Sequence, residues 1–193
     1  MFMDTKKIIQ ALTYFAYRQE DKTLDNMKAY KLLWLADRLQ LRRCGRTVSG
    51  DTYYAMPYGP VPSDAKNILE KQPTHLHHDG DFMDSFIETK GKRYKAVKEP
   101  DLKYFSVSDR EVLDKVLDSY NKMTTMQLSE LSHKYPEWLP YEAMIKSEGR
   151  NSSYPIDVDL FFESCDADKI GFFDDNLEAL QLAKELYHQY NRC

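Results

Sequence analysis

The hydrophobic and polar positions of the first fifty residues predict two helices that differ in character. Apolar residues recur at helical spacing from Ile8 to Ala16, so residues 5–18 read as an amphipathic helix. A second helix is expected to begin at Asp25, which can cap it, and to stop before Gly45. Apolar side chains cover most of the circumference of this second helix: Met27, Tyr30, Leu32, Leu33, Trp34, Leu35, Leu39 and Leu41. We therefore expect it to be buried at the centre of the domain.

The next fifty residues change to the pattern of short strands. Thr47 to Tyr58 is rich in β-branched and aromatic residues and contains a Ser-Gly-Asp turn signal. The prolines that follow are expected to end any strand: Pro57, Pro60 and Pro62. Ser63 can then cap a short helix through Leu69. After a polar loop, 82–89 and 93–97 flank Lys90-Gly91-Lys92 and predict a β-hairpin.

Helical spacing returns in the second half of the chain. Capping-box spacing at Ser108 and again at Thr124 predicts two helix starts, and residues 155–162 predict a short acidic helix. Asp174 or Asp175 should cap a last helix with an apolar stripe at Leu177, Leu180, Ala183, Leu186 or Tyr187, and Tyr190. We predict one compact domain over residues 1–193, mainly α with a small antiparallel β-sheet (α+β) that includes a β-hairpin.

Composition narrows the class of protein. With 42% apolar and 30% charged residues, the chain has the profile of a globular protein, and no apolar run is long enough to span a membrane. Its beginning lacks the pattern of a secretory signal. The three cysteines are widely separated, which fits a reducing cytoplasm. The net charge of −4 disfavours nucleic acid as a partner.

Candidate chemistry is sparse. The loop with His75, His77 and His78 is the one cluster of possible metal ligands, but adjacent histidines point apart on an extended chain, so a solvated loop is the better interpretation. No nucleophile elbow, phosphate-binding loop or pair of spaced carboxylates is present in the sequence. We expect no catalytic residues and no cofactor, and hence a binding protein instead of an enzyme.

Three positions of the second helix stand out by charge. Lys31, Arg38 and Arg42 fall within about 40° of one another on a helical wheel. They are interpreted as a solvated edge, as a phosphate-facing stripe or as the contact for an acidic partner. Asp37 lies among dense apolar side chains, and a buried carboxylate must be paired or hydrogen-bonded. We predict that it is a structural lock, with donors from the Tyr58-Gly59-Pro60 loop or from Arg46.

His133 follows a predicted helix end and precedes Trp138. A lone histidine at that place is more often a C-terminal cap or a core hydrogen-bond donor than a base. The abundance of tyrosine, at 14 copies, suits a protein interface, since one ring offers apolar area and a hydroxyl. Core-boundary positions for most of these rings are an equal alternative.

Four segments together resemble the Panacea domain, whose members are described as antitoxins or phage-associated proteins. These segments are Lys31–Asp37, Gly45–Val48, Tyr54–Pro62 and Leu131 through Trp138, with Tyr58-Gly59-Pro60-Val61 the most specific. The resemblance covers about residues 24–145. It leaves the first helix and residues 150–193 as the parts specific to this system.

The resemblance implies a bacterial or prophage toxin–antitoxin pair. It implies an antitoxin that neutralises a toxin from the adjacent gene by direct binding, with no catalytic residue to carry over. One alternative is that the protein delivers the toxin to a protease. Another is autoregulation through DNA binding, by a winged-helix-like arrangement of the helices in 108–134 and the hairpin 82–97. A hydrolase without a readable motif is a more distant alternative. Candidate partner contacts lie in the apolar stripes of the first and last helices, in residues 53–58 and in the basic stripe: Lys31, Arg38, Arg42, Tyr53, Tyr54, Leu177, Leu180, Tyr187 and Tyr190.

Overall fold

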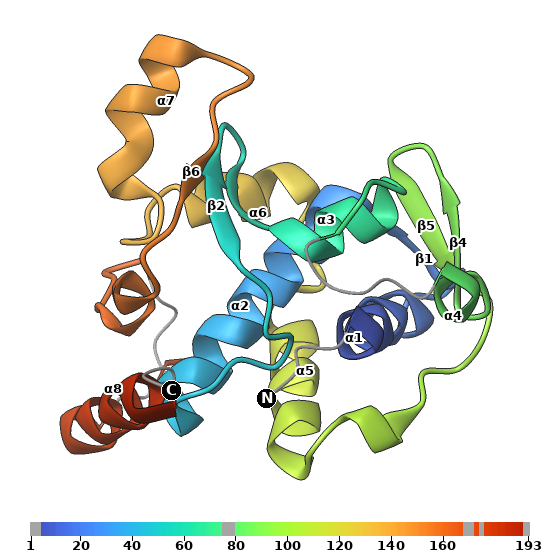
Figure 1. Ribbon diagram of the computed structural model, residues 1–193, viewed down its shortest axis with the longest axis horizontal. Coiled ribbons are helices and arrows are strands. Elements are labelled where there is room, and N and C mark those ends of the chain that lie inside the picture. The colour runs from blue at the N-terminus through green and yellow to red at the C-terminus, as the bar shows by residue number, and fades with distance from the viewer. Residues whose placement is uncertain (1–4, 75–79, 168–171, 174–175, 191–193) are drawn as a thin grey trace.

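A long helix, α2 (Asn26–Cys44), forms the centre of the molecule in the computed structural model, which describes residues 5–74, 80–167, 172–173 and 176–190. Figure 1 shows α2 running diagonally through the middle, with the other elements around it. Nearly every residue from Ala29 to Arg42 is buried. The prediction of a central, all-round apolar helix is confirmed.

Both ends of α2 follow from the sequence. The Asp25 side chain accepts a hydrogen bond from the Lys28 N–H at 3.1 Å and caps the first turn. At the other end Gly45 takes the left-handed conformation, and its N–H donates to the Leu41 carbonyl at 2.8 Å. The predicted start and stop signals are confirmed at both positions.

Helices pack on several sides of α2. The amphipathic helix α1 (Thr5–Tyr17) packs against α2 and buries its stripe from Ile8 to Phe15 completely. Further contacts to α2 come from α3 (Ser63–Leu69), α5 (Val107–Tyr120), α6 (Thr125–Ser132) and α8 (Leu177–Tyr190). The described apolar residues form one continuous core around this helix.

One antiparallel sheet lies beside α1, with the strand order β1-β5-β4. The predicted hairpin is confirmed as β4 (Ile87–Lys90) and β5 (Arg93–Ala96) around Gly91. The strand β1 (Thr23–Asp25), which was not predicted, pairs Leu24 with Tyr94 of β5. Three residues are too short for a readable alternation of polar and apolar positions. Ahead of β4, the short helix α4 (Gly80–Asp84) replaces the beginning of the predicted strand.

The second sheet corrects the expectation that prolines would end the strands. Its order is β3-β2-β6, with β2 (Tyr53–Met56) in the middle. Two of the three prolines lie inside β3 (Gly59–Pro62), where Pro60 faces Ala55 and Pro62 faces Tyr53. Proline is tolerated there because β3 is an edge strand and needs no donor on its outer side. The two-residue strand β6 (Tyr154–Pro155) pairs with the other edge of β2.

Helix caps are partly as predicted. The capping box at Thr124 and Gln127 is confirmed. For α5 the box uses Ser106 and Asp109 instead of Ser108, two residues earlier than predicted. Helix α3 is not capped by Ser63. The two oxygens of Asp51 accept the N–H groups of Asp64 and Ala65 at 2.9 and 2.8 Å, so the cap comes from a residue distant in the sequence.

The last quarter of the chain lies along β2 and α2. It follows the turn η2 (Leu139–Tyr141) and consists of helix α7 (Glu142–Glu148), strand β6, the turn η3 (Val158–Phe162) and α8. A further short turn, η1 (Leu102–Tyr104), precedes α5. Figure 1 shows α7 projecting at one corner and α8 at another. The predicted fold class, mainly α with small antiparallel sheets, is confirmed.

The winged-helix-like arrangement is not formed. Helices α5 and α6 pack on α2, whereas the β4–β5 hairpin pairs with β1 and packs on α1. The hairpin is therefore part of another layer and is not a wing beside those helices.

Candidate functional site

The carboxylate of Asp37 is fully buried and accepts hydrogen bonds from the loop that follows α2. Oδ1 accepts the N–H groups of Val48 and Ser49 at 2.8 and 2.9 Å. Oδ2 accepts the hydroxyls of Ser49 and of Tyr53, the latter at 2.7 Å. Burial raises the pKa of Asp37, and these hydrogen bonds oppose that rise. The buried structural lock predicted for Asp37 is thus present.

The partners of Asp37 differ from the predicted ones. The Tyr58-Gly59-Pro60 turn does not donate to it, and Arg46 instead donates to Asp109 of α5 at 2.7 Å. Lys7 donates to the same carboxylate at 2.9 Å. Burial alone would raise the pKa of Asp109, but the hydrogen bonds from Lys7, the Ser106 N–H and Arg46 lower it.

Lys31 holds the turn that had been assigned to Asp37. Its side chain is fully buried, and Nζ donates to the Pro60 carbonyl at 2.7 Å. Burial lowers the pKa of Lys31 to about 7. Two further donors hold the same turn from the other side: Ser129 Oγ to the Tyr58 carbonyl at 2.9 Å and Trp138 Nε1 to the Met56 carbonyl at 2.8 Å. The Tyr-Gly-Pro segment is therefore a clasped turn at the end of β2.

His133 belongs to this clasp. It is the C-terminal cap residue of α6, as predicted, and its ring stacks on Trp138 with centroids 3.9 Å apart. Burial and the nearby Lys31 charge lower the pKa of His133. The ring of His133 thus packs against the indole whose Nε1 holds the turn through the Met56 carbonyl.

The prediction of an exposed basic stripe is wrong. Lys31 and Arg38 are fully buried and Arg42 is only 2% exposed. Arg38 forms an ion pair with the fully buried Glu137 at 2.5 Å. Sequence reasoning missed Glu137, although its place between Pro136 and Trp138 in the most apolar loop of that region was a usable signal. A partner cannot reach these cations unless the chain that covers them moves.

That covering chain is the segment around η3. Arg38 donates to the carbonyls of Phe161 and Glu163 at 3.1 and 2.6 Å. Arg42 donates to the same two carbonyls at 3.0 and 2.9 Å. Both guanidinium groups also lie over the ring of Phe173, within 5.8 Å of its centroid. The two arginines thus hold residues from the C-terminal quarter of the chain.

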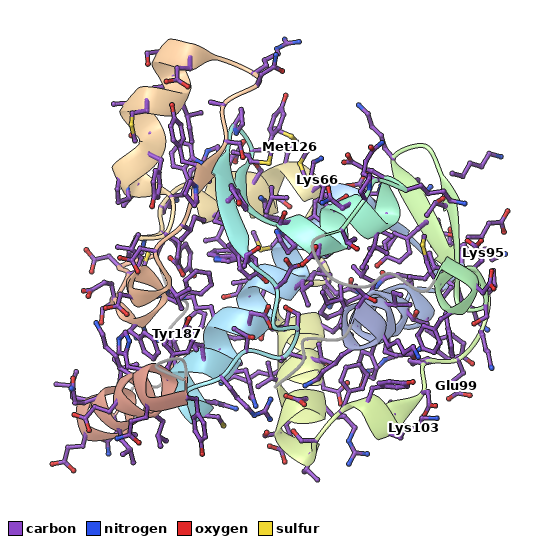
Figure 2. All side chains as sticks on the ribbon, in the orientation of Figure 1. Lys66, Lys95, Glu99, Lys103, Met126 and Tyr187 are labelled. Carbon is purple, nitrogen blue, oxygen red and sulfur yellow. The ribbon has the colours of Figure 1, made fainter. Side chains whose placement is uncertain are left out.

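The other predicted contact residues are divided between core and surface. Tyr53 is buried against Phe161, and Tyr54 is half-buried. The stripe of α1 is entirely in the core, so it is not a partner surface. In α8, Leu177 and Tyr190 are more than three-quarters exposed, whereas Leu180 and Tyr187 are half-buried. Figure 2 shows Tyr187 on the side of α8 that meets η3, where its ring lies 6.2 Å from Phe162.

An exposed apolar pair lies next to the clasped turn; its Tyr58 falls within the predicted contact segment 53–58, whereas Met126 was not predicted. Tyr58 is 48% exposed at the tip of the β2–β3 hairpin, and Met126 is 54% exposed on α6. Met126 is one helical turn before Ser129, which binds the Tyr58 carbonyl. Figure 2 shows Met126 at the same edge of the molecule as the hairpin tip. This edge therefore carries two exposed apolar side chains beside a turn that hydrogen bonds hold in place.

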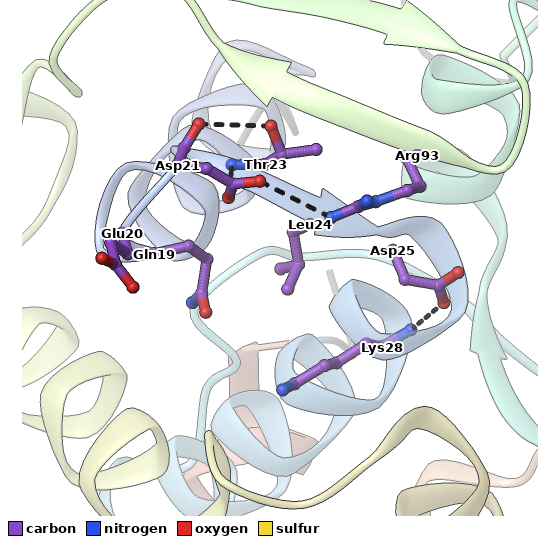
Figure 3. Close-up of a pocket in the computed structure, with 8 residues that line it drawn as sticks. All are labelled: Gln19, Glu20, Asp21, Thr23, Leu24, Asp25, Lys28 and Arg93. Atoms are coloured by element: carbon purple, nitrogen blue, oxygen red, sulfur yellow. Dashed lines mark hydrogen bonds and ion pairs between the residues drawn. The ribbon is translucent and has the colours of Figure 1, made fainter.

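A polar depression of about 650 Å³ opens beside β1, lined by Gln19, Glu20, Asp21, Thr23, Leu24, Asp25, Lys28 and Arg93 (Figure 3). Several of its side chains are engaged with one another or with Asn121 after α5. Asp21 lies 3.8 Å from Arg93, and Lys28 donates to the Asn121 carbonyl at 2.6 Å. The arrangement has neither a nucleophile next to a base nor a convergent set of ligands.

Histidines 75, 77 and 78 lie outside the described residues. Among the residues that the structure does describe, no group of three His, Cys, Asp or Glu side chains is placed to hold a metal ion. No described helix has the length and apolar character needed to cross a bilayer.

Comparison with known proteins assigns the central part of the molecule. The family model described as "Antitoxin SocA-like, Panacea domain" matches residues 30–139, more than half of the chain. This stretch contains most of α2, the Asp37 network, the clasped turn and Glu137. No curated protein and no solved structure matches the chain.

Proposed function

The chain belongs to the family of antitoxin SocA-like Panacea domains, and on that premise we propose that it is an antitoxin that neutralises a toxin protein by binding it directly. The family match over residues 30–139 is the observation that carries this proposal. The matched stretch builds the buried core and the clasped turn, so the features typical of the family make a scaffold that presents a surface.

The ionisable groups of the matched region favour binding over catalysis. Asp37, Lys31 and Arg38 are all fully buried, and each holds a neighbouring loop through the hydrogen bonds given above. A catalytic acid, base or nucleophile must reach its substrate. We therefore propose a non-enzymatic antidote that acts in the bacterial cytoplasm on the product of the adjacent gene. The gene pair belongs to the bacterium or to a prophage.

Co-expression tests this function. The neighbouring gene should stop growth when induced alone and be harmless when this chain is produced with it. The matched control is the gene of this chain with a stop codon early in its reading frame. If it fails to protect, the protein and not its transcript is the antidote. The two proteins should then co-purify as one complex on size exclusion.

Stoichiometry separates the mechanisms. Direct neutralisation requires about one antitoxin for each toxin, so the activity of purified toxin should fall linearly to zero as this chain is titrated in. Complete protection at far below equimolar amounts would mean an enzymatic antidote. Protection without a complex, together with falling toxin levels in cells, would mean delivery to a protease. Tight, sequence-specific binding to its own promoter would favour the autoregulator.

A further inference from the structure

The C-terminal strap, defined as residues 154–167, is bound to the family domain as a peptide ligand would be. It lies beyond the matched residues 30–139 and crosses from β2 to α2. The strap begins with β6, which adds an antiparallel strand to β2: Tyr54 faces Pro155 and Ala55 faces Tyr154. The N–H of Ile156 continues the pairing with a bond to the Tyr53 carbonyl at 2.9 Å.

Side chains of the domain hold the strap by its main chain. The hydroxyl of Tyr141 donates to the Pro155 carbonyl at 2.9 Å. The carbonyls of Phe161 and Glu163 are the shared acceptors of Arg38 and Arg42. Contacts to carbonyl oxygens do not depend on the identity of the residue that carries them, so another segment that follows the same path can make the same bonds.

Specificity at this surface comes from apolar pockets. Phe161 and Phe162 are 2% and 5% exposed, and Phe161 lies against Tyr53 of β2 with ring centroids 5.3 Å apart. Ile156 is also buried, at 8% exposed. Strand addition combined with side-chain pockets is a recurring mode by which proteins bind extended segments of a partner.

We propose that this surface, formed by the edge of β2 that β6 now covers together with Arg38 and Arg42, is the toxin-binding site, and that the strap is its intramolecular occupant. The inference rests on the proposed function. The partner it fits is a segment of the toxin that pairs with β2 in place of β6 and then turns as η3 does. It presents carbonyls to the two arginines and fills the places of Phe161 and Phe162 with adjacent large apolar side chains.

Displacement of the strap must be compensated, because leaving the surface exposes three apolar side chains and removes the carbonyl acceptors of two buried arginines. Only a segment that repeats both kinds of contact can take its place. The strap therefore acts as a competitor that rejects weakly complementary chains.

A reversible tether tests the proposal in the full-length chain. Cys165 Sγ lies 3.1 Å from the main-chain carbonyl of Lys134, so Lys134→Cys introduces a cysteine at the residue beside it, to be oxidised to a disulfide that fixes the strap to the domain. The variant also carries Cys44→Ser and Cys193→Ser to prevent other pairings, and mass spectrometry confirms the disulfide. The matched control adds Cys165→Ala, which leaves residue 134 without a partner. The probe is the purified product of the neighbouring gene.

We expect the oxidised variant to bind the toxin at least tenfold more weakly than the same protein after reduction, and the control to bind equally under both conditions. Equal, tight binding by the oxidised and reduced forms would overturn the strap proposal while leaving the antitoxin function standing. An absence of binding in both forms and in the unmodified chain would instead overturn the proposed function.

Hydrogen exchange on the unmodified complex gives a second measurement that needs no disulfide. In the complex, amides of β6 and η3 should exchange at least tenfold faster than in the free protein, while the amides of β2 stay protected because a new strand replaces β6. A strap that remains protected in a stoichiometric complex would place the toxin elsewhere and refute the proposal.

Discussion

Two sides of helix α2 use buried charge in opposite ways. On one side the carboxylate of Asp37 accepts hydrogen bonds from Val48, Ser49 and Tyr53, which follow it closely in the sequence. On the other side Arg38 and Arg42 donate to carbonyls 119 to 125 positions away. The first network lies within the family match and the second joins that match to a segment outside it.

The Asp37 network is part of the domain fold, whereas the strap occupies a surface of that fold. Every donor to Asp37 comes from its own neighbourhood, so the loop and the start of β2 cannot leave without breaking the domain. The arginines bind main-chain atoms of a distant segment, and Glu137 already pairs with Arg38 inside the matched region. The domain can therefore keep its core ion pair while the strap leaves.

The largest effect is expected from Asp37→Ala. The substitution leaves two buried N–H groups and two hydroxyls without their acceptor, which should cost about 3–5 kcal/mol of unfolding free energy. Urea melts followed by circular dichroism measure it. Asp84→Ala, on an exposed and distant ion pair, is the control and should change stability by less than about 0.5 kcal/mol. A wild-type midpoint for Asp37→Ala would contradict the lock.

The next effect is a dependence of the unfolding free energy on pH, which tests the role of the buried Lys31 at the clasped turn. The native state releases the Lys31 proton near pH 7, whereas the unfolded chain keeps it until about 10.5. Unfolding therefore takes up a proton in this window, and stability should rise by about 3 kcal/mol from pH 7 to about pH 9.5. Lys31→Met removes the titrating group and should flatten the curve. Parallel curves for the two proteins would mean that Lys31 stays charged when buried.

Arg42→Met should act on the strap side and only locally. Both carbonyls keep Arg38 as a donor, so the global cost should be about 2 kcal/mol or less, while β6 and η3 amides exchange faster. Arg43→Met is the control, because its side chain is exposed on the next position of the same helix. Uniform acceleration across α1 and α5 as well would show that the strap is part of the cooperative core.

The smallest expected difference in stability concerns the packing of α8 against Gly45 at the end of α2. A Cβ on Gly45 would lie 2.5 Å from the Ala183 carbonyl and 2.9 Å from Leu186 Cβ, whereas one on Gly91 would meet no atom within 4 Å. Both glycines have φ near +60°, so Gly45→Ala and Gly91→Ala carry the same left-handed strain. Gly45→Ala should lose about 1 kcal/mol more in thermal melts. Equal losses would show that α8 yields without cost.

The elements with long periodic patterns were predictable, and those that depend on distant chain were not. The ends of α2, the β4–β5 hairpin and the burial of Asp37 follow from local spacing and composition. The burial of Arg38 and Arg42 does not, because its cause is a segment 120 residues later whose carbonyls leave no mark on the sequence. The same holds for the Asp51 cap of α3, and for the two-residue β6, which is too short to show a period.

The prolines of β3 have a consequence for self-association. Pro60 and Pro62 face Ala55 and Tyr53 across the hairpin, so the outer side of β3 lacks their N–H groups and is a poor template for another chain. The sheet can grow only past β2, where the strap sits. A protein that can add a foreign strand at only one sheet edge binds one such strand at a time. It can end a growing sheet, but it cannot link copies of itself into a fibre.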